Sequence, residues 1–411
     1  MNTEITVADA RSLRPVEVSG TAFAVGFFLS FRLCIVYLSV TLFGLDASTG
    51  SALSLGLELL LFGLVCFSAL GAPARSFKSM AQLKPVRWVI AFVVFAGLSL
   101  VWSEAASLPN SVAYWSGMAL DVGSVVLLLR CGTGSEEAHS ILKGFVWSAC
   151  WIGLMAWIMP TASDLRLGDE QYLNTNEIGN LCAFAIFFAQ YLARTADGEW
   201  RIAKGFLVIT LIRSLSKTTL AAFLVSEGLL LLLDKSISRK TKLMVFASVL
   251  VLLLVFWGLL AAYYDYYTNN GNQAETLTGR VVIWLYALAA IFDHPWTLWI
   301  GHGFDAWWKV VPPFGGELFE ARHAENEVLQ QLYAYGAVGV VLLIGLYWSL
   351  FRQLRQLKAS SAKTMFLCCL CFVVVRGLAE SDAFDLLFPM WAILLVSVLA
   401  GSEPHVNSVT V

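Results

Sequence analysis

Long, nearly uninterrupted runs of apolar residues are the feature that most constrains how this chain can fold. Hydrophobic residues make up 58% of the 411 residues and charged residues only 14%, whereas a soluble domain carries about 25% charged residues. A backbone crosses lipid only as helices or as a closed barrel, and a barrel needs short alternating segments. The continuous runs therefore predict an all-α polytopic membrane protein, with 1–411 as a single integral membrane domain.

The apolar runs divide into about twelve intervals suited to transmembrane helices. These intervals are 21–44, 50–71, 86–102, 111–130, 141–160, 176–194, 203–215, 218–234, 243–263, 327–351, 364–379 and 385–402. A further run at 279–292 is too short to span a bilayer, so we interpret it as an amphipathic or re-entrant helix in an external loop.

The lysine and arginine residues predict the orientation, because cytoplasmic loops carry an excess of both. With the N-terminus inside, most of the 27 basic residues fall in inner segments. This places cytoplasmic tails at 1–20 and 403–411 and a large periplasmic loop at 264–326. The basic residues left outside need another reason, and they include Arg213, Lys217, Arg280, Arg322 and Arg376.

The densest charge lies where this loop ends, with Arg322, His323, Glu325 and Glu327 just before a long apolar helix. Ionisable residues beside a bilayer are a functional-site hypothesis by default. Arginine and lysine suit a phosphate on a membrane lipid, and their charge would also stabilise a pyrophosphate leaving group. Transfer to a sugar hydroxyl needs a base, for which His323, Glu325 and Glu327 are the candidates.

Motifs across about residues 90–350 resemble the bacterial O-antigen ligase and O-antigen or exopolysaccharide polymerase superfamily. In that family a His precedes an Asn, and Gly-x-x-Gly follows nine residues later; here Asn326 is followed by Gly336-Ala337-Val338-Gly339. The other blocks, in family order, are Leu98-Ser99-Leu100-Val101-Trp102-Ser103, Asn174-Thr175-Asn176-Glu177-Ile178-Gly179, Ser214-Leu215-Ser216-Lys217, Thr278-Gly279-Arg280 through Trp284, Asp293-His294-Pro295 and Gly301-His302-Gly303-Phe304.

The resemblance implies an inner-membrane glycosyltransferase that faces the periplasm. Such enzymes transfer a glycan from undecaprenyl pyrophosphate to an acceptor hydroxyl, without a metal or another cofactor. Family arginines hold the pyrophosphate, a role that carries over to Lys217 and Arg280, and we add the nearby cations Arg213 and Arg322 to this group.

The family's catalytic His position, directly before the Asn, is Glu325 in this chain. Either Glu325 is the base, or His323 has taken over, or the activity has been altered or lost. Our prediction is Glu325 as the base, assisted by His323.

Several other residues have two possible roles each. Asn326, Asn174 and Asn176 would contact a glycan or phosphate, or cap and support helices. Trp307 and Trp308 would stack on sugar rings or anchor the loop at the membrane interface. Arg32 and Asp121 lie mid-span and would pair across the first and fourth predicted helices, in a structural or a mechanistic role.

Three functions remain as alternatives. A repeat-unit polymerase is favoured, because Gly301-His302-Gly303-Phe304 followed by Trp307-Trp308 resembles exopolysaccharide polymerases. The second is an O-antigen ligase that moves the chain to the lipid A core. The third is a transporter of a lipid-linked glycan, although transporters usually place their sites at the bilayer midplane, often with internal repeats. The expected partners are the lipid-linked glycan, the bilayer, and chain-length regulator or export proteins, and not nucleic acid.

Overall fold

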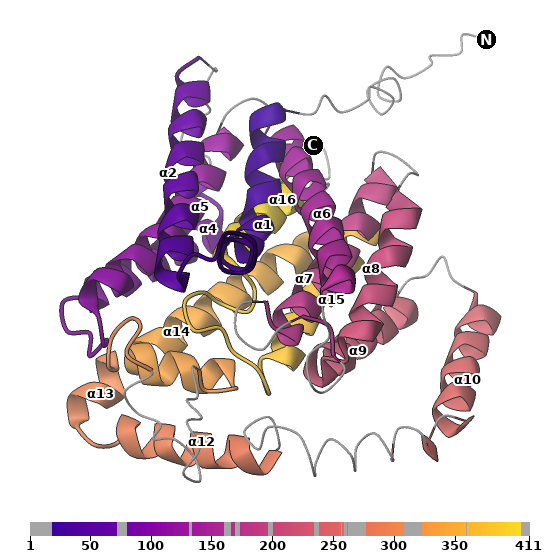
Figure 1. The fold of residues 1–411 in the computed structure, drawn as a ribbon. Coiled ribbons are helices and arrows are strands. Elements are labelled where there is room, and N and C mark those ends of the chain that lie inside the picture. Colours follow the sequence, from indigo (N-terminus) through magenta and orange to yellow (C-terminus); the bar gives the residue numbers. More distant parts are fainter. Residues whose placement is uncertain are drawn as a thin grey trace, which may run out of the picture.

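The computed structural model describes residues 19–71, 80–130, 134–159, 166–168, 173–195, 200–233, 238–255, 257–258, 261, 277–307, 323–358 and 360–403. Its helices are α1 (Gly20–Phe43), α2 (Ala47–Gly71), α4 (Lys84–Ser99), α5 (Leu108–Arg130), α6 (Ser135–Ile158), α7 (Thr175–Thr195), α8 (Trp200–Ser214), α9 (Lys217–Leu233), α10 (Arg239–Val255), α12 (Leu277–Ile291), α13 (Pro295–Ile300), α14 (Glu327–Gln356), α15 (Ser361–Arg376) and α16 (Met390–Ser402). The predicted all-α class is confirmed, and Figure 1 shows the helices gathered into one bundle, with α10 standing apart.

Each of the twelve predicted intervals contains a helix, but not every boundary was right. The interval 385–402 begins too early, because α16 starts only at Met390 and the Asp385 carboxylate accepts hydrogen bonds from the backbone N–H groups of Leu386 and Met390. Among the described residues, five helices are long and apolar enough to cross a membrane: α1, α2, α5, α6 and α14. The chain is therefore a multi-pass membrane protein, while twelve crossings remain a prediction.

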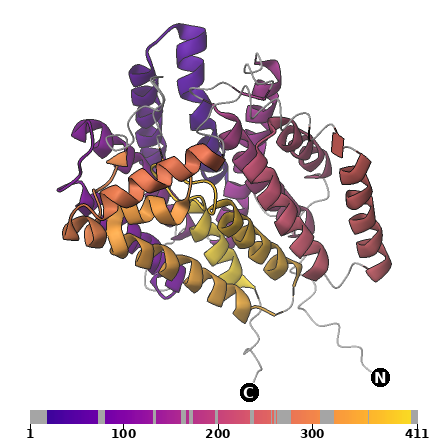
Figure 2. The same ribbon diagram turned by 90° about the horizontal axis from the view of Figure 1, so that it is seen from below.

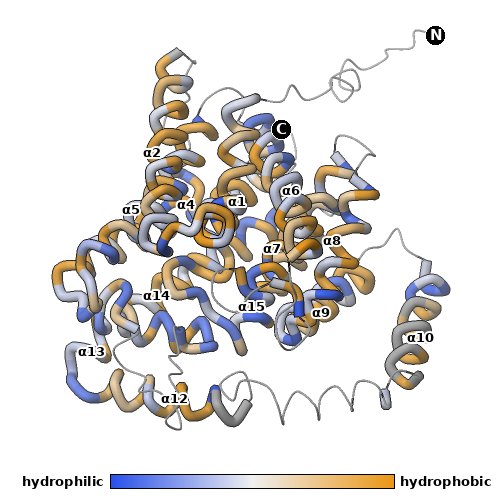
Figure 3. Tube along the Cα trace, in the orientation of Figure 1, coloured by the Kyte–Doolittle hydropathy of each residue, from blue (hydrophilic) through white to orange (hydrophobic). Residues whose placement is uncertain are grey.

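The outward surface of the bundle is apolar, as expected where lipid is the solvent. On α2, Leu60, Phe67 and Leu70 are all more than half exposed, and Figure 3 shows hydrophobic residues along the helices at the edge of the bundle. Such a continuous apolar surface is rare on a soluble monomer. The exposure of α2 therefore agrees with a membrane location.

Helices α1 and α6 pack backbone against backbone. A Cβ atom at Gly26 would overlap the carbonyl of Ile141, and one at Gly144 would overlap the carbonyl of Phe23. Close approach through small residues is how helices associate in membranes, where no hydrophobic force draws them together. These two glycines thus set the distance between α1 and α6.

Helix α12 lies along α14, close to the short helix α13 (Figures 1 and 2). The predicted helix at 279–292 is therefore present, but it is not amphipathic in the usual sense. Ile283, Ala287 and Ile291 are buried, whereas Val281 and Leu285 are exposed on the other side. The helix is apolar on both sides, as suits a helix packed on protein along one side and on lipid along the other. Helix α13 was not predicted.

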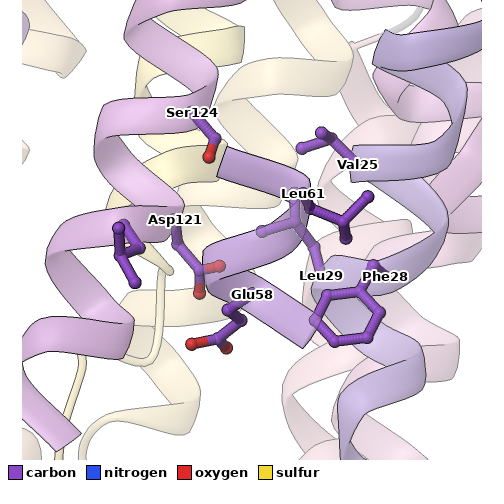
Figure 4. Close-up of a pocket in the computed structure, with 8 residues that line it drawn as sticks. Val25, Phe28, Leu29, Glu58, Leu61, Asp121 and Ser124 are labelled. Carbon is purple, nitrogen blue, oxygen red and sulfur yellow. The ribbon is translucent and has the colours of Figure 1, made fainter. Parts of the chain in front are cut away.

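The predicted pair between Arg32 and Asp121 is confirmed. Arg32 Nη1 contacts the Asp121 carboxylate and lies 2.9 Å from Glu58 Oε1, so one guanidinium joins α1, α2 and α5. A small cavity of about 10 Å³ lies beside these carboxylates and is lined also by Val25 and Leu61 (Figure 4). That volume is close to the least that holds one water molecule, so no glycan or phosphate fits there.

Candidate functional site

The loop that carries His323 and Glu325 is fastened to α12. Trp284 Nε1 donates to the Ala324 carbonyl over 2.9 Å, and Arg280 Nη2 lies 3.2 Å from Glu325 Oε2. Residues four apart lie on the same face of a helix. Arg280 and Trp284 therefore hold the loop together, which gives a physical reason for the block from Gly279 to Trp284.

The predicted base candidates Glu325 and His323 lie side by side. Glu325 Oε1 lies 3.5 Å from His323 Nδ1, while Oε2 of the same carboxylate faces Arg280. The side chains of Glu325, His323 and Arg280 are 17%, 26% and 11% exposed. The structure thus brings one expected phosphate ligand and both expected bases into a single, largely buried contact.

The backbone is strained at Glu325 and at two other turns. Among the described residues, the non-glycine residues with positive φ are Leu215, Asp305 and Glu325, with φ values of 56°, 60° and 51°. The left-handed region is unfavourable for such side chains, and residues held there tend to occur at functional sites. Leu215 and Glu325 fall within motif blocks, and Asp305 follows one directly, so the strain is consistent with a functional role for these turns.

Asn326 links the loop to two neighbouring segments through its side-chain amide. Its Oδ1 accepts from Leu329 N over 3.0 Å, which caps α14, and its Nδ2 donates to the Leu378 carbonyl over 3.0 Å. A side-chain cap of this kind satisfies one of the free N–H groups at a helix start. Asn326 therefore caps α14, as one of its two predicted roles requires, and it joins the start of α14 to the segment after α15.

The segment after α15 also contacts the site, a contact that was not predicted from the sequence. Ser381 Oγ lies 3.4 Å from His323 Nδ1, and Glu380 Oε2 accepts from Thr218 Oγ1 over 3.1 Å. Thr218 belongs to the first turn of α9. Residues 376–385 carry several charges between two apolar helices, which is the same signal that pointed to residues 322–327.

Lys217 begins α9 and is exposed, whereas Arg213 lies in the last turn of α8 and is partly buried. Lys217 directly precedes Thr218, so the Ser214-Leu215-Ser216-Lys217 turn adjoins the segment after α15, which contains Glu380. Figure 3 shows hydrophilic residues gathered between α9, α14 and α15. The turn expected to bind pyrophosphate thus lies next to the base candidates.

The asparagine block acts as a support for this turn. Asn176 Oδ1 accepts from Ser216 Oγ over 2.7 Å, and Asn174 Oδ1 accepts from Glu177 N over 2.9 Å, which caps α7. Thr175 Oγ1 donates to the Ser214 carbonyl. Residues separated by about 40 positions are therefore joined in the fold, and both asparagines have partners within the protein.

Burial determines the protonation of His323. Desolvation lowers its pKa, although the negative charges of Glu380 and Asp382 act in the opposite direction. A neutral imidazole carries a lone pair that can accept a proton. His323 is therefore in the form that a general base requires at neutral pH.

Two predicted candidates, Glu327 and Trp307, are buried within the protein. The Glu327 side chain is 3% exposed, and its Oε1 accepts from Tyr347 OH over 2.7 Å and from Leu387 N over 3.0 Å. Trp307 is also 3% exposed and packs edge-on against Tyr333, so its ring is not presented to a sugar. Arg322 and Trp308 lie outside the described residues.

The block Gly336-Ala337-Val338-Gly339 introduces a kink into α14. Gly336 has φ 63° and ψ −157° and breaks the helix geometry, and a Cβ there would overlap the backbone of Trp299. The kink frees the carbonyls of Tyr333 and Ala334, which accept from the N–H groups of His302 and Gly303. The Gly-x-Gly-Phe turn is thereby attached to α14, and the need for glycine at position 336 is steric.

One group in the described part of the chain could hold a metal ion. His323, Glu325 and Glu380 each offer a ligand atom, and these atoms lie within 4.8 Å of one another. However, the positively charged Arg280 already pairs with Glu325, and Arg280 would repel a cation bound beside it. The arrangement suits an anionic ligand beside a proton acceptor better than a metal.

The fold and the site together define a class of protein. It is a multi-pass helical membrane protein in which cations and a candidate base meet at the ends of helices. Residues 202–344 match the family model described as O-antigen ligase. The chain is 24% identical over 301 residues to the exopolysaccharide production protein ExoQ of Rhizobium meliloti (strain 1021). That match covers 66% of this chain and 66% of the relative. The resemblance to the O-antigen ligase and polymerase superfamily is confirmed.

Proposed function

We propose that this protein is a glycosyltransferase of the bacterial inner membrane that acts in surface polysaccharide synthesis. It transfers a glycan from undecaprenyl pyrophosphate to an acceptor sugar hydroxyl, and it acts as a repeat-unit polymerase. The observation that carries the proposal is the contact between Arg280, Glu325 and His323, in which a phosphate-binding cation touches a proton-accepting pair. The matches to the O-antigen ligase model and to ExoQ support the same activity.

The pyrophosphate binds to Arg280 and Lys217. Arginine pairs with phosphate through two parallel hydrogen bonds, and lysine adds a point charge. In the protein without donor, Arg280 is paired with Glu325. Binding of the donor draws Arg280 toward phosphate oxygens, so that the Glu325 carboxylate loses its cationic partner as the donor arrives.

The proton acceptor is the Glu325–His323 pair. A carboxylate is ordinarily a weaker base than an imidazole, and burial lowers the pKa of His323, which keeps its imidazole neutral. We therefore assign proton acceptance to His323 and stabilisation of the resulting imidazolium to Glu325. This reverses the order of the two roles expected from the sequence.

The reaction balances with these groups alone. The acceptor oxygen attacks the anomeric carbon of the donor glycan and loses its proton to His323. The bond between that carbon and the pyrophosphate oxygen breaks, and its electron pair leaves with undecaprenyl pyrophosphate. Arg280 and Lys217 stabilise the negative charge that develops on the leaving group.

The orientation follows from the chemistry and the charge distribution. Basic residues are most frequent in the segments assigned to the cytoplasm, so the site faces the periplasm and both termini lie in the cytoplasm. Exposed apolar residues on α12 then contact the outer leaflet. The lipid-linked donor reaches the site from the membrane at this depth.

An O-antigen ligase is the second candidate, favoured by the description of the matched family model. The two activities differ only in the acceptor. A polymerase joins one lipid-linked repeat to another, whereas a ligase transfers the finished chain to the lipid A core. The polymerase is preferred because the similar protein is named for exopolysaccharide production.

Deletion of the gene in its native host tests the proposal. The length of the glycan left on undecaprenyl pyrophosphate is measured by mass spectrometry. Single repeat units indicate a polymerase, and long chains with bare lipid A core indicate a ligase. An unchanged pool contradicts both and leaves the transporter or an inactive relative. Complementation with wild type and with Glu325→Gln, at equal protein level, shows whether the site is responsible.

A further inference from the structure

Arg376 is a buried cation that no motif explains. It ends α15 and is 4% exposed. The family model match stops at residue 344, well before it. By its position in the sequence, Arg376 belongs to the few basic residues predicted to lie on the outer side. An isolated buried charge is costly unless it is paired or hydrogen-bonded, so its presence needs a reason.

The contacts of Arg376 leave part of its guanidinium without a partner. Arg376 Nε donates to Thr219 Oγ1 over 3.2 Å, whereas the buried Nη1 has no hydrogen-bond partner. Among the described residues, no ion pair includes Arg376. Arginine has five N–H donors in a fork that matches phosphate. The Nε contact with Thr219 places this guanidinium at the first turn of α9.

The first turn of α9 attracts an anion for independent reasons. Thr218 and Thr219 lie directly after Lys217 at the start of a helix of 17 residues. The N–H groups at a helix start are unpaired within the helix and carry partial positive charge, which together favour phosphate. An anion is already there, since the Glu380 carboxylate accepts from Thr218 Oγ1. Glu380 is 3% exposed.

We propose that Arg376 and the first turn of α9 bind a phosphate group of the pyrophosphate-linked donor, in the place that the Glu380 carboxylate holds in the free protein. Arg376 is then a third cation of the site, beside Arg280 and Lys217. Two carboxylates are then displaced by the donor: Glu325, which contacts Arg280, and Glu380, which accepts a hydrogen bond from Thr218 Oγ1. The inference rests on the proposed function, because it assumes a donor that carries pyrophosphate.

The experiment measures binding of inorganic pyrophosphate to the purified full chain in detergent by isothermal titration calorimetry. Loss of hydrogen bonds to a charged group predicts about tenfold to a hundredfold weaker binding for Arg376→Gln, and less weakening for Arg376→Lys. Thr219→Val removes the bond that aims the guanidinium and should give a smaller loss without a change in charge. Lys358→Gln, an exposed position between α14 and α15, is the control with the same change in charge and should bind as wild type.

Glu380→Gln separates a binding role from a structural one. Removal of the competing carboxylate should make pyrophosphate bind more tightly, an effect that damage to the fold does not produce. Thermal unfolding identifies any variant that fails to fold, and Arg376→Lys, Thr219→Val and Glu380→Gln then decide the question. Equal affinity in wild type, Arg376→Lys, Thr219→Val and Glu380→Gln would overturn the inference.

The outcomes also separate this inference from the proposed function. Arg280→Gln is measured alongside the other variants. Binding that is lost in Arg280→Gln but unchanged in Arg376→Gln rejects only the role of Arg376. No binding of pyrophosphate to the wild-type protein rejects the pyrophosphate site itself, and the proposed donor chemistry with it.

Discussion

In the part of the chain that the structure describes, the ionisable residues around Arg32 and those around His323 are arranged differently. Around Arg32, the charged residues come from the middle of α1, α2 and α5, and one guanidinium serves the two carboxylates of Glu58 and Asp121. Around His323, they come from helix ends and loops, such as the start of α12 and the segment after α15. The residues around Arg32 connect regular helices to one another. The residues around His323 connect loops and helix ends.

The difference indicates which group does chemistry. Mid-helix residues are fixed by the packing of whole helices, so an ion pair there mainly holds the helices together. Groups at helix ends can change partners through small movements of side chains, and the strained Glu325 backbone lies among them. We therefore expect substitutions near Arg32 to reduce stability and substitutions near His323 to reduce transfer.

The largest effect is expected on the reaction rate. His323→Gln and Glu325→Gln should each lower the rate of glycan transfer by about 10²- to 10⁴-fold, because general base catalysis contributes this much. The rate is measured on purified protein with a lipid-linked donor. Asp293→Asn, at a carboxylate that is 72% exposed, is the matched control and should act as wild type. Normal transfer by Glu325→Gln would remove Glu325 from the mechanism.

The opposite behaviour is expected at the other group. Arg32→Ala leaves two buried carboxylates without their cation, and breaking a buried pair costs about 3 kcal/mol or more. The unfolding free energy in detergent should fall by that order, while the transfer rate per folded molecule stays the same. A slower rate with unchanged stability would instead mean that the residues around Arg32 take part in the reaction.

A milder change at Arg280 distinguishes binding from catalysis. Arg280→Lys keeps the positive charge but loses the two parallel hydrogen bonds to phosphate. We expect the KM for the donor to rise about tenfold, as for the loss of a charged hydrogen bond, with a smaller change in kcat. A loss confined to kcat would place Arg280 at the proton acceptor, through Glu325, and not at the pyrophosphate.

The pH dependence follows from the lowered pKa of His323. At neutral pH the imidazole is neutral and accepts a proton, so the rate should be constant there. As the pH falls through this pKa, which lies below the ordinary value for histidine, the base becomes protonated and transfer is lost. Rates measured from weakly acidic to neutral pH should show this decline in the wild type. A residual rate with the same acidic decline in His323→Gln would assign the titration to another group.

The smallest effect is expected from metal removal. His323, Glu325 and Glu380 are close enough to hold a cation, but Arg280 already neutralises part of their charge. Treatment with a chelator, followed by dialysis, should leave the transfer rate unchanged. A lost rate that returns with a single divalent metal would contradict the proposed site chemistry.

Tertiary contacts explain why several residue roles could not be predicted. Glu327 and Glu325 are two positions apart and look alike in the sequence, yet Asn326 caps α14 between them. Glu327 consequently turns inward to Tyr347, while Glu325 turns toward Arg280. Arg376 and Glu380 were missed as site residues because no local pattern shows that the end of α15 meets the start of α9.

The sequence alone determined the helical membrane class, the approximate position of the helices and the pairing of Arg32 with Asp121. These features depend on the apolar runs and on the cost of charge in lipid, which are properties of local composition. The tertiary structure decided which polar residues face each other, because each motif turn is bonded to a residue far along the chain: Ser216 to Asn176, Gly303 to Ala334 and Asn326 to Leu378. Such meetings depend on the packing of whole helices, including the kink at Gly336 and the close crossing at Gly26, and no local pattern encodes them.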